Sequence, residues 1–208
     1  MTGAVRMQGL VSSRSPAELP REVIERAAAR DPAACRALIR RYQRPVGRLL
    51  WRLLAPSGLE HLTEDLAQET MVRVFGALPR FDIDGPATVS TWILKIATRL
   101  GINELQRRRP KVEPLSAKAE RLSGGPTADH EVRRKAIAAA INDAVAELPP
   151  DFRAAFLLRE YHDLDYAEIA QVLELSPGTV KSRLSRARAS LRTSLAQLHA
   201  QHQESDHG

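Results

Sequence analysis

The sequence predicts an all-α protein made of two small helical domains that are joined by a flexible linker. The chain has 208 residues, of which 43% are hydrophobic and only 4% aromatic. Alanine, leucine and arginine dominate, and these residues favour packed helices. Apolar residues recur with a helical period in several segments, and no segment alternates as a strand would. A proline- and glycine-rich stretch at residues 110–131 separates the two helical blocks.

The N-terminal domain is predicted to span residues 21–109, after a polar tail at residues 1–20. Residues 56–58 (Pro-Ser-Gly) end its first apolar helix. A second helix is expected over 63–78, with Thr63 as N-cap and two acids in the first turn, where the helix dipole favours them. The turn-rich segment 79–86 leads to a third helix over 90–109, which stops before Pro110. The periodic apolar positions of the first helix are Leu38, Ile39, Tyr42, Val46, Leu49, Leu50 and Leu53.

The C-terminal domain is predicted to span residues 132–199, followed by a polar tail at 200–208. Helices are expected over 132–148, 151–161, 166–173 and 177–199. Ser176 fits an N-cap and Pro177 fits the first position of the last helix, because its missing N–H would be unpaired there anyway. The last two helices are joined by a tight turn and therefore outline a helix-turn-helix, although the turn lacks a glycine.

The last of these helices carries a basic outward face. Residues 176–198 contain five bases and no acid, whereas the preceding segment, 147–175, has seven acids and two bases. On a helical wheel Val180, Leu184, Ala187 and Leu191 fall within about 40 degrees of one another and form the core stripe. The outward and flanking positions are Thr179, Lys181, Ser182, Arg183, Ser185, Arg186 and Arg188. This set suits base edges and phosphates in a DNA major groove, and the competing interpretation is a solvated helix face.

The segment DYAEIAQVLELSPGTVKSRLSRARASL (residues 165–191) resembles the promoter-binding helix-turn-helix of bacterial RNA polymerase sigma factors of the extracytoplasmic-function (ECF) type. Upstream, ELPPDFRAAFLLREYHDLDY is similar to the helices that precede this motif in the family. The resemblance implies that residues 132–199 form sigma region 4, which reads the upstream promoter element. It also implies that Lys181, Ser182, Ser185 and Arg186 contact bases and phosphates.

The N-terminal motif LTEDLAQETMVRVFGALPRFD (residues 62–82) places acids and a small apolar residue on one helix face. By itself this pattern is also typical of an ordinary acidic helix surface. However, DLAQE resembles the sigma-factor signature that grips the clamp helices of the largest polymerase subunit. The resemblance therefore implies that residues 21–109 form sigma region 2 and that the polymerase-binding residues are Asp65, Leu66, Gln68, Glu69 and Val72.

The next segment, STWILKIATRLGINELQRRR (residues 90–109), resembles the helix that recognises and melts the minus-ten element. The implied DNA-contacting residues are Trp92, Lys95, Arg99, Asn103, Gln106 and Arg107. Trp92 fits a core anchor equally well, and the three terminal arginines also suit a soluble helix end. This region departs from the family pattern at Val89, Arg99, Asn103 and Gln106. The loop 81–90, which captures a flipped-out base in such factors, is idiosyncratic. Promoter preference therefore does not follow from the resemblance.

Several other classes of function are disfavoured by what the sequence lacks. One cysteine, Cys35, leaves no internal disulfide and no multi-thiolate zinc site. Motifs for phosphate loops, metalloproteases and nucleophile elbows are missing, and the six histidines are scattered. We therefore expect no enzyme activity, no cofactor and no metal. The sequence has neither a membrane-length apolar run nor a signal-peptide core, which predicts a cytoplasmic protein without membrane insertion.

Together these features predict a transcription initiation factor that binds core RNA polymerase, directs it to specific promoters and assists promoter opening. The expected partners are core RNA polymerase, promoter DNA and, by the resemblance, an anti-sigma protein; the free chain is expected to be a monomer. One alternative is a stand-alone helix-turn-helix DNA-binding regulator, which would act as its own dimer. Another is a sigma-like remnant that serves only in protein interaction.

Overall fold

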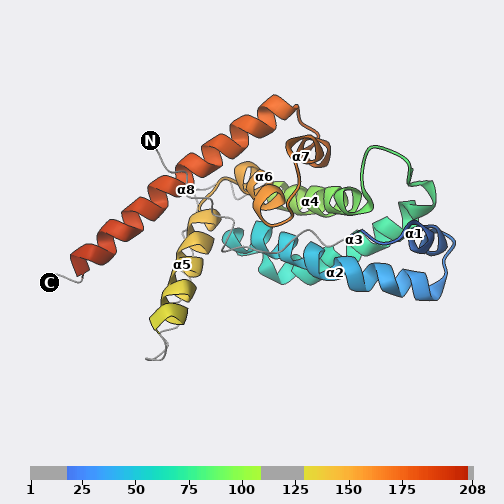
Figure 1. Ribbon diagram of the computed structural model, residues 1–208, viewed down its shortest axis with the longest axis horizontal. Coiled ribbons are helices and arrows are strands. Elements are labelled where there is room, and N and C mark those ends of the chain that lie inside the picture. The colour runs from blue at the N-terminus through green and yellow to red at the C-terminus, as the bar shows by residue number, and fades with distance from the viewer. Residues whose placement is uncertain (1–17, 109–128, 206–208) are drawn as a thin grey trace.

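The computed structural model describes the backbone at residues 18–108 and 129–205, and the side chains at 18–108 and 137–196. Within these ranges the chain is helical and contains no strand, which confirms the all-α prediction (Figure 1). The α-helices are α1 (Arg21–Ala28), α2 (Pro32–Leu54), α3 (Thr63–Ala77), α4 (Val89–Arg107), α5 (Asp129–Ala146), α6 (Pro150–Glu160), α7 (Tyr166–Leu173) and α8 (Pro177–Ser205).

The long helix α2 is the centre of the N-terminal domain. Asp31 caps it by accepting a hydrogen bond from the Ala34 N–H at 2.8 Å, and Pro32 occupies the first helical position. Six of the seven predicted positions of its apolar stripe are buried, and the seventh, Ile39, is only half-buried. After α2, Gly58 adopts the left-handed conformation (φ 69°), which ends the helix at the predicted break. Helix α1 precedes it as a separate helix that the apolar pattern did not predict, although the Asp31-Pro32 pair is a recognisable start signal for α2.

Helices α3 and α4 pack against α2 and complete the domain. The expected N-cap at Thr63 is wrong by one position, because the turn Glu60–Leu62 leads directly into α3 and makes Thr63 its first residue. Helix α4 does have a side-chain cap: the hydroxyl of Thr88 accepts a hydrogen bond from the Thr91 N–H at 3.1 Å. Gly101 allows α4 to approach α2 closely, since a Cβ there would lie 2.8 Å from a methyl carbon of Leu53.

Helices α5 to α8 form the C-terminal domain. The predicted core stripe of α8 is correct: Val180, Leu184, Ala187 and Leu191 are all buried. Burial of each of the three larger side chains, Val180, Leu184 and Leu191, contributes about 1.5 to 3 kcal/mol. Helix α7 has the predicted bounds and begins with a capping box between Asp165 and Glu168. Helix α8 continues to Ser205, six residues past its predicted end, and α5 begins at Asp129, within the predicted linker.

The two helical domains lie against each other (Figure 1). Helix α7 packs on α4, and α6 packs on both α2 and α4, so that the buried apolar side chains of the two domains form one continuous cluster. The predicted flexible linker at 110–131 falls largely outside the described residues. What the sequence did not predict is that the halves on either side of it share an interface.

Candidate nucleic-acid interface

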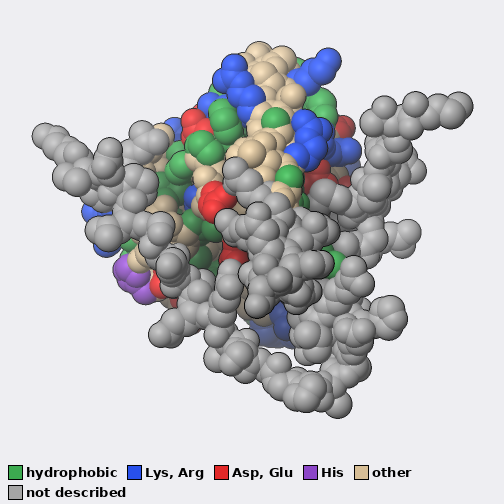
Figure 2. Space-filling view, turned by 90° about the vertical axis from the view of Figure 1, so that its left-hand side faces the viewer, with side chains coloured by type: hydrophobic (Ala, Val, Ile, Leu, Met, Phe, Trp, Pro, Cys, Tyr) green, Lys and Arg blue, Asp and Glu red, His purple; other side chains and the backbone are tan. Residues whose placement is uncertain are grey.

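Helix α8 carries the residues that the sequence assigned to the upstream promoter element. Lys181, Ser182, Ser185 and Arg186 are all exposed on its outer side, opposite the buried stripe. Basic side chains stand out at the top of the molecule in Figure 2, the end where α8 begins in Figure 1. Thr179 is half-buried and belongs to the helix start, because its N–H donates to the Ser176 hydroxyl at 3.2 Å. This short polar and basic face of the helix is accessible and could enter the major groove of DNA.

The flanking arginines of α8 are bound inside the domain. Arg183 pairs with Asp151 at 3.2 Å, and Arg188 pairs with Glu160 at 2.9 Å. The hydrogen bond from Arg188 to Glu160 raises the pKa of that guanidinium. Both pairs link α8 to α6, so these arginines hold the helix-turn-helix together in this structure. To make the predicted contacts with DNA phosphates, these arginines must either bind the phosphate while paired or exchange their carboxylate partner for it.

The turn between α7 and α8 explains how the motif manages without glycine. Glu174 takes the left-handed conformation (φ 55°) that glycine normally supplies at a helix C-terminus. The Leu175 N–H donates to the Ala170 carbonyl at 3.0 Å and closes the end of α7. The turn therefore has the usual backbone geometry, and it presents a carboxylate where a glycine would present nothing.

On α3, the predicted polymerase-docking residues divide into two groups. Asp65, Gln68 and Val72 are exposed on one face, and Val72 keeps 66% of its surface accessible. Leu66 is half-buried and packs on the core, and Glu69 pairs with Arg73 at 2.7 Å along the same helix. A shallow pocket lined by Arg30, Cys35, Val72 and Phe75 adjoins this face. A surface of this kind, apolar at one point with charges around it, suits a protein partner.

On α4, the predicted minus-ten residues also differ in their surroundings. Asn103 and Gln106 are exposed, and Arg107 binds Glu104 of its own helix. The hydrogen bonds from Arg107 and Arg108 lower the pKa of Glu104 to about 2. Lys95 and Arg99, in contrast, both reach Glu174 of the C-terminal domain, at 3.1 and 3.7 Å. The pattern of the sequence contained no sign of this partner beyond an acidic segment that precedes α8.

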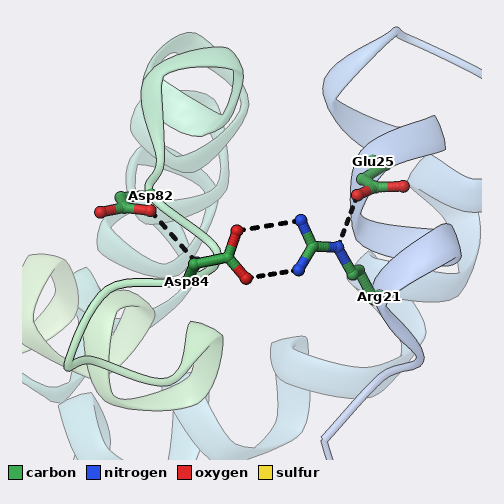
Figure 3. A network of polar contacts seen from close by, with 4 residues as sticks. All are labelled: Arg21, Glu25, Asp82 and Asp84. Atoms are coloured by element: carbon green, nitrogen blue, oxygen red, sulfur yellow. Dashed lines mark hydrogen bonds and ion pairs between the residues drawn. The ribbon is translucent and has the colours of Figure 1, made fainter.

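Trp92 is half-buried and lies against the loop that precedes α4. Its ring meets that of Phe81 with centroids 4.8 Å apart, and it packs against the apolar cluster. The same loop is also held by α1 (Figure 3): Arg21 binds both carboxylate oxygens of Asp84 and also pairs with Glu25. The Asp84 N–H donates to Asp82 at 3.1 Å, which tightens the turn. These contacts favour the interpretation of Trp92 as an anchor of the loop.

The described side chains contain no cluster of three or more His, Cys, Asp or Glu residues that could hold a metal ion. The histidines near the C-terminus, His199, His202 and His207, lie outside the described side chains. In the described ranges every helix is too short or too polar to cross a lipid bilayer.

Comparisons with known proteins agree with this architecture. Residues 38–111 match the family model of Sigma-70 region 2, and residues 138–191 match that of Sigma-70 region 4. The chain is 30% identical over 190 residues to the RNA polymerase sigma-H factor of Pseudomonas aeruginosa, covering 87% of this chain and 96% of that protein. It is 31% identical over 175 residues to the ECF RNA polymerase sigma-E factor of Haemophilus influenzae, covering 80% and 89%.

The match to the ECF RNA polymerase sigma factor SigE of Mycolicibacterium smegmatis is 36% identical over 161 residues, which is 76% of this chain but 60% of that protein. Among solved structures, CnrH in complex with the cytosolic domain of CnrY has a TM-score of 0.60 at 23% identity and covers 85% of this chain and 97% of its own. The latter similarity supports the fold. From the two family models and these relatives we conclude that the chain belongs to the ECF family of RNA polymerase sigma factors, which are promoter-directing transcription initiation factors.

Proposed function

We propose that the two domains divide the work of initiation between three surfaces. The outer face of α3 docks on core RNA polymerase, α4 holds the opened minus-ten strand, and α8 reads the upstream element in the major groove. The observation that carries this proposal is the outer face of α8, where Lys181, Ser182, Ser185 and Arg186 are exposed opposite a fully buried stripe. Residues 176–198 also hold five bases and no acid, whereas a solvated helix face usually carries charges of both signs.

The proposed domain limits are residues 21–109 for region 2, 110–131 for the linker and 132–199 for region 4. Opening of the promoter needs no nucleotide hydrolysis by this chain, because stacking and phosphate contacts made only with the opened strand offset the cost of unpairing. We place the protein in the cytoplasm, with core polymerase and promoter DNA as its partners. A stand-alone regulator that acts as a dimer is the alternative, and the match of residues 38–111 to Sigma-70 region 2 favours the initiation factor over it.

An anti-sigma protein is a further proposed partner. Structures with the same fold were solved as complexes with CnrY and, for RpoE of Bartonella quintana, with the anti-sigma factor NepR. The second has a TM-score of 0.59 at 20% identity and covers 77% of this chain. In the present chain the shallow pocket that Val72 lines adjoins the proposed polymerase-docking face. A protein that covered this face would compete directly with polymerase.

The proposal as a whole is tested by run-off transcription with purified core polymerase on pooled genomic fragments at controlled salt. Discrete transcripts that depend on this protein are the expected result. DNA binding by the chain alone, without new transcripts, would instead support the stand-alone regulator.

Removal of Arg186 should weaken recognition of the upstream element. Arg186→Ala is expected to reduce holoenzyme binding to promoter DNA by about 1 to 3 kcal/mol, because the lost guanidinium faces the groove. Filter binding at fixed salt gives the promoter affinity, and competition for core polymerase gives the docking affinity, which should be unchanged. Arg192→Ala, which removes one exposed charge six residues further along the same helix, is the matched control. Equal losses in both variants would contradict the assignment.

Removal of Asp65 should have the converse effect. Asp65→Ala is expected to lower the affinity for core polymerase by about 1 to 2 kcal/mol while duplex binding by α8 stays the same, because the carboxylate lies on the α3 face. The measurement is fluorescence anisotropy of a labelled chain titrated with core enzyme. Glu22→Ala on α1 removes an exposed carboxylate of the same domain and serves as the control. An unchanged affinity for core in Asp65→Ala would move the docking site away from α3.

A further inference from the structure

The cationic side chains of α4 are occupied by the C-terminal domain in this structure. Lys95 and Arg99 are one turn apart, and both approach the same carboxylate oxygen of Glu174, at 3.1 and 3.7 Å. These are two of the residues that the proposed function assigns to the minus-ten strand. A phosphate and the Glu174 carboxylate would compete for the same pair of cations, since both are anionic oxygens.

A second contact holds the first turn of α4. The Thr91 hydroxyl donates to Glu168 Oε1 at 2.9 Å. Glu168 Oε2 accepts from the Asp165 N–H at 2.8 Å, as part of the capping box of α7. One carboxylate thus both starts α7 and binds α4. The contact is half-buried, so that it is less screened by solvent than the Glu174 pairs.

The position of Glu174 in the turn makes the contact specific. A left-handed residue at a helix C-terminus is normally glycine, because a side chain there costs conformational energy. In this chain the position holds a glutamate whose side chain crosses to the other domain. The residue with the strained backbone is therefore also the residue that forms the interdomain ion pairs.

Other contacts join the domains over a wider area. The Arg52 guanidinium of α2 lies 4.1 Å from the ring centre of Tyr161, and Arg153 donates to the Leu53 carbonyl at 2.8 Å. The outer face of helix α8, in contrast, stays exposed. The interface therefore blocks one proposed DNA surface and leaves the other accessible.

From these contacts we propose that the cationic face of α4 is a surface with two mutually exclusive occupants, the α7–α8 turn of the same chain and the displaced DNA strand. This inference rests on the proposed role of α4 in binding the minus-ten strand. In the closed chain Glu174 and Glu168 hold the turn against α4, and the strand gains access to Lys95 and Arg99 only when the domains separate. The upstream element is readable in both states.

The variant Glu174→Gly tests the proposal without endangering the fold, because glycine suits the left-handed turn. The matched control is Asp163→Gly, since Asp163 is the other exposed left-handed carboxylate of this domain (φ 59°) and lies outside the interdomain ion pairs described above. Both changes remove one negative charge and the same kind of backbone strain. Any difference between them therefore reports the contact with α4.

Two properties of the full-length variants are measured: the radius of gyration by small-angle X-ray scattering, and the affinity for a labelled single-stranded oligothymidine by anisotropy. We expect Glu174→Gly to enlarge the radius and to raise the affinity about three- to fivefold, the effect of losing exposed ion pairs. Asp163→Gly should match the unmodified chain. High salt should bring the unmodified chain toward Glu174→Gly in its radius of gyration.

The outcomes separate the inference from the proposed function. If the oligonucleotide binds and Arg99→Ala weakens that binding in the Glu174→Gly background, α4 binds single strands as proposed. If α4 binds in this way but Glu174→Gly behaves like Asp163→Gly in both measurements, the exclusion by the turn is wrong. If Glu174→Gly enlarges the radius while Arg99→Ala leaves oligonucleotide binding unaltered, the role of α4 fails, and the exclusive occupancy fails with it.

Discussion

Replacing Arg153 by methionine should lower the free energy of unfolding by about 3 kcal/mol, one of the two largest effects expected in this protein. The side chain is only 4% exposed and makes three hydrogen bonds to backbone carbonyls. Its Nη1 donates to Leu53 at 2.8 Å, and its Nη2 donates to Ala146 at 2.7 Å and to Leu148 at 2.8 Å. Burial lowers the pKa of the guanidinium to about 10, so that it remains charged at neutral pH.

The effect is large because the three acceptors of Arg153 are all backbone carbonyls, which lose their only described side-chain donor in the variant. Leu53 lies in the last turn of α2, and Ala146 is the last residue of α5, where carbonyl groups have no partner within the helix. The negative ends of two helix dipoles thus surround the cation. Methionine keeps the apolar stem but leaves all three carbonyls unpaired in the interior, each at a cost of about 1 to 3 kcal/mol before relaxation.

Urea denaturation followed by circular dichroism measures the change. Arg192→Met, at an exposed position of α8, is the control and should stay within about 0.5 kcal/mol of the unmodified chain. Arg153→Lys should recover only part of the loss, because one ammonium group does not match the three carbonyls as a planar guanidinium does. A loss below about 1 kcal/mol in Arg153→Met would show that water replaces the guanidinium at these carbonyls.

The helices and the helix-turn-helix could be predicted because their signals are local. Ser176 and Pro177 mark the start of α8, and the spacing of Val180 and Leu184 fixes which of its sides is buried. The same spacing places Lys181 and Arg186 on the outer side of the helix, where the structure has them. Local patterns also set the ends of α7 correctly, since its capping residue Asp165 lies directly before the first periodic position.

What the sequence could not supply are contacts between residues far apart in the chain. A helical wheel places Arg183 and Arg188 beside the outer face but does not show that α6 carries a carboxylate for each. Glu174 reads as an ordinary polar turn residue until α4 is seen beneath it. Arg153 lies in a run whose pattern predicts only a helix, and its burial depends on carbonyls from two separate segments, the end of α2 and residues 146–148.

The second large effect is a loss of stability on mild acidification, which should depend on His162. This residue is 5% exposed in the connection between α6 and α7, next to Tyr161, whose ring lies against Arg52. Burial, with smaller contributions from the charges of Arg52 and Arg48, lowers the pKa of the imidazole from 6.5 to about 4. The folded chain therefore holds His162 neutral at pH values where the unfolded chain protonates it.

The sign of the effect follows from this difference in proton binding. Between pH 6.5 and about 4 the unfolded state binds more protons, so stability is complete above the upper value and falls as the pH decreases toward the lower one. The slope approaches about 1.4 kcal/mol per pH unit within that window. Urea denaturation at a series of pH values should show this slope in the unmodified chain and a shallower one in His162→Leu. The variant keeps all carboxylates, which titrate below about pH 5, so that the difference between the two slopes reports His162 alone.

Because Arg48 and Arg52 belong to α2, protonation of His162 adds a third positive charge at the interdomain contact. Separation of the two domains would relieve the repulsion between these charges, as unfolding does. Identical pH dependence in both chains would mean that His162 reaches solvent without either event.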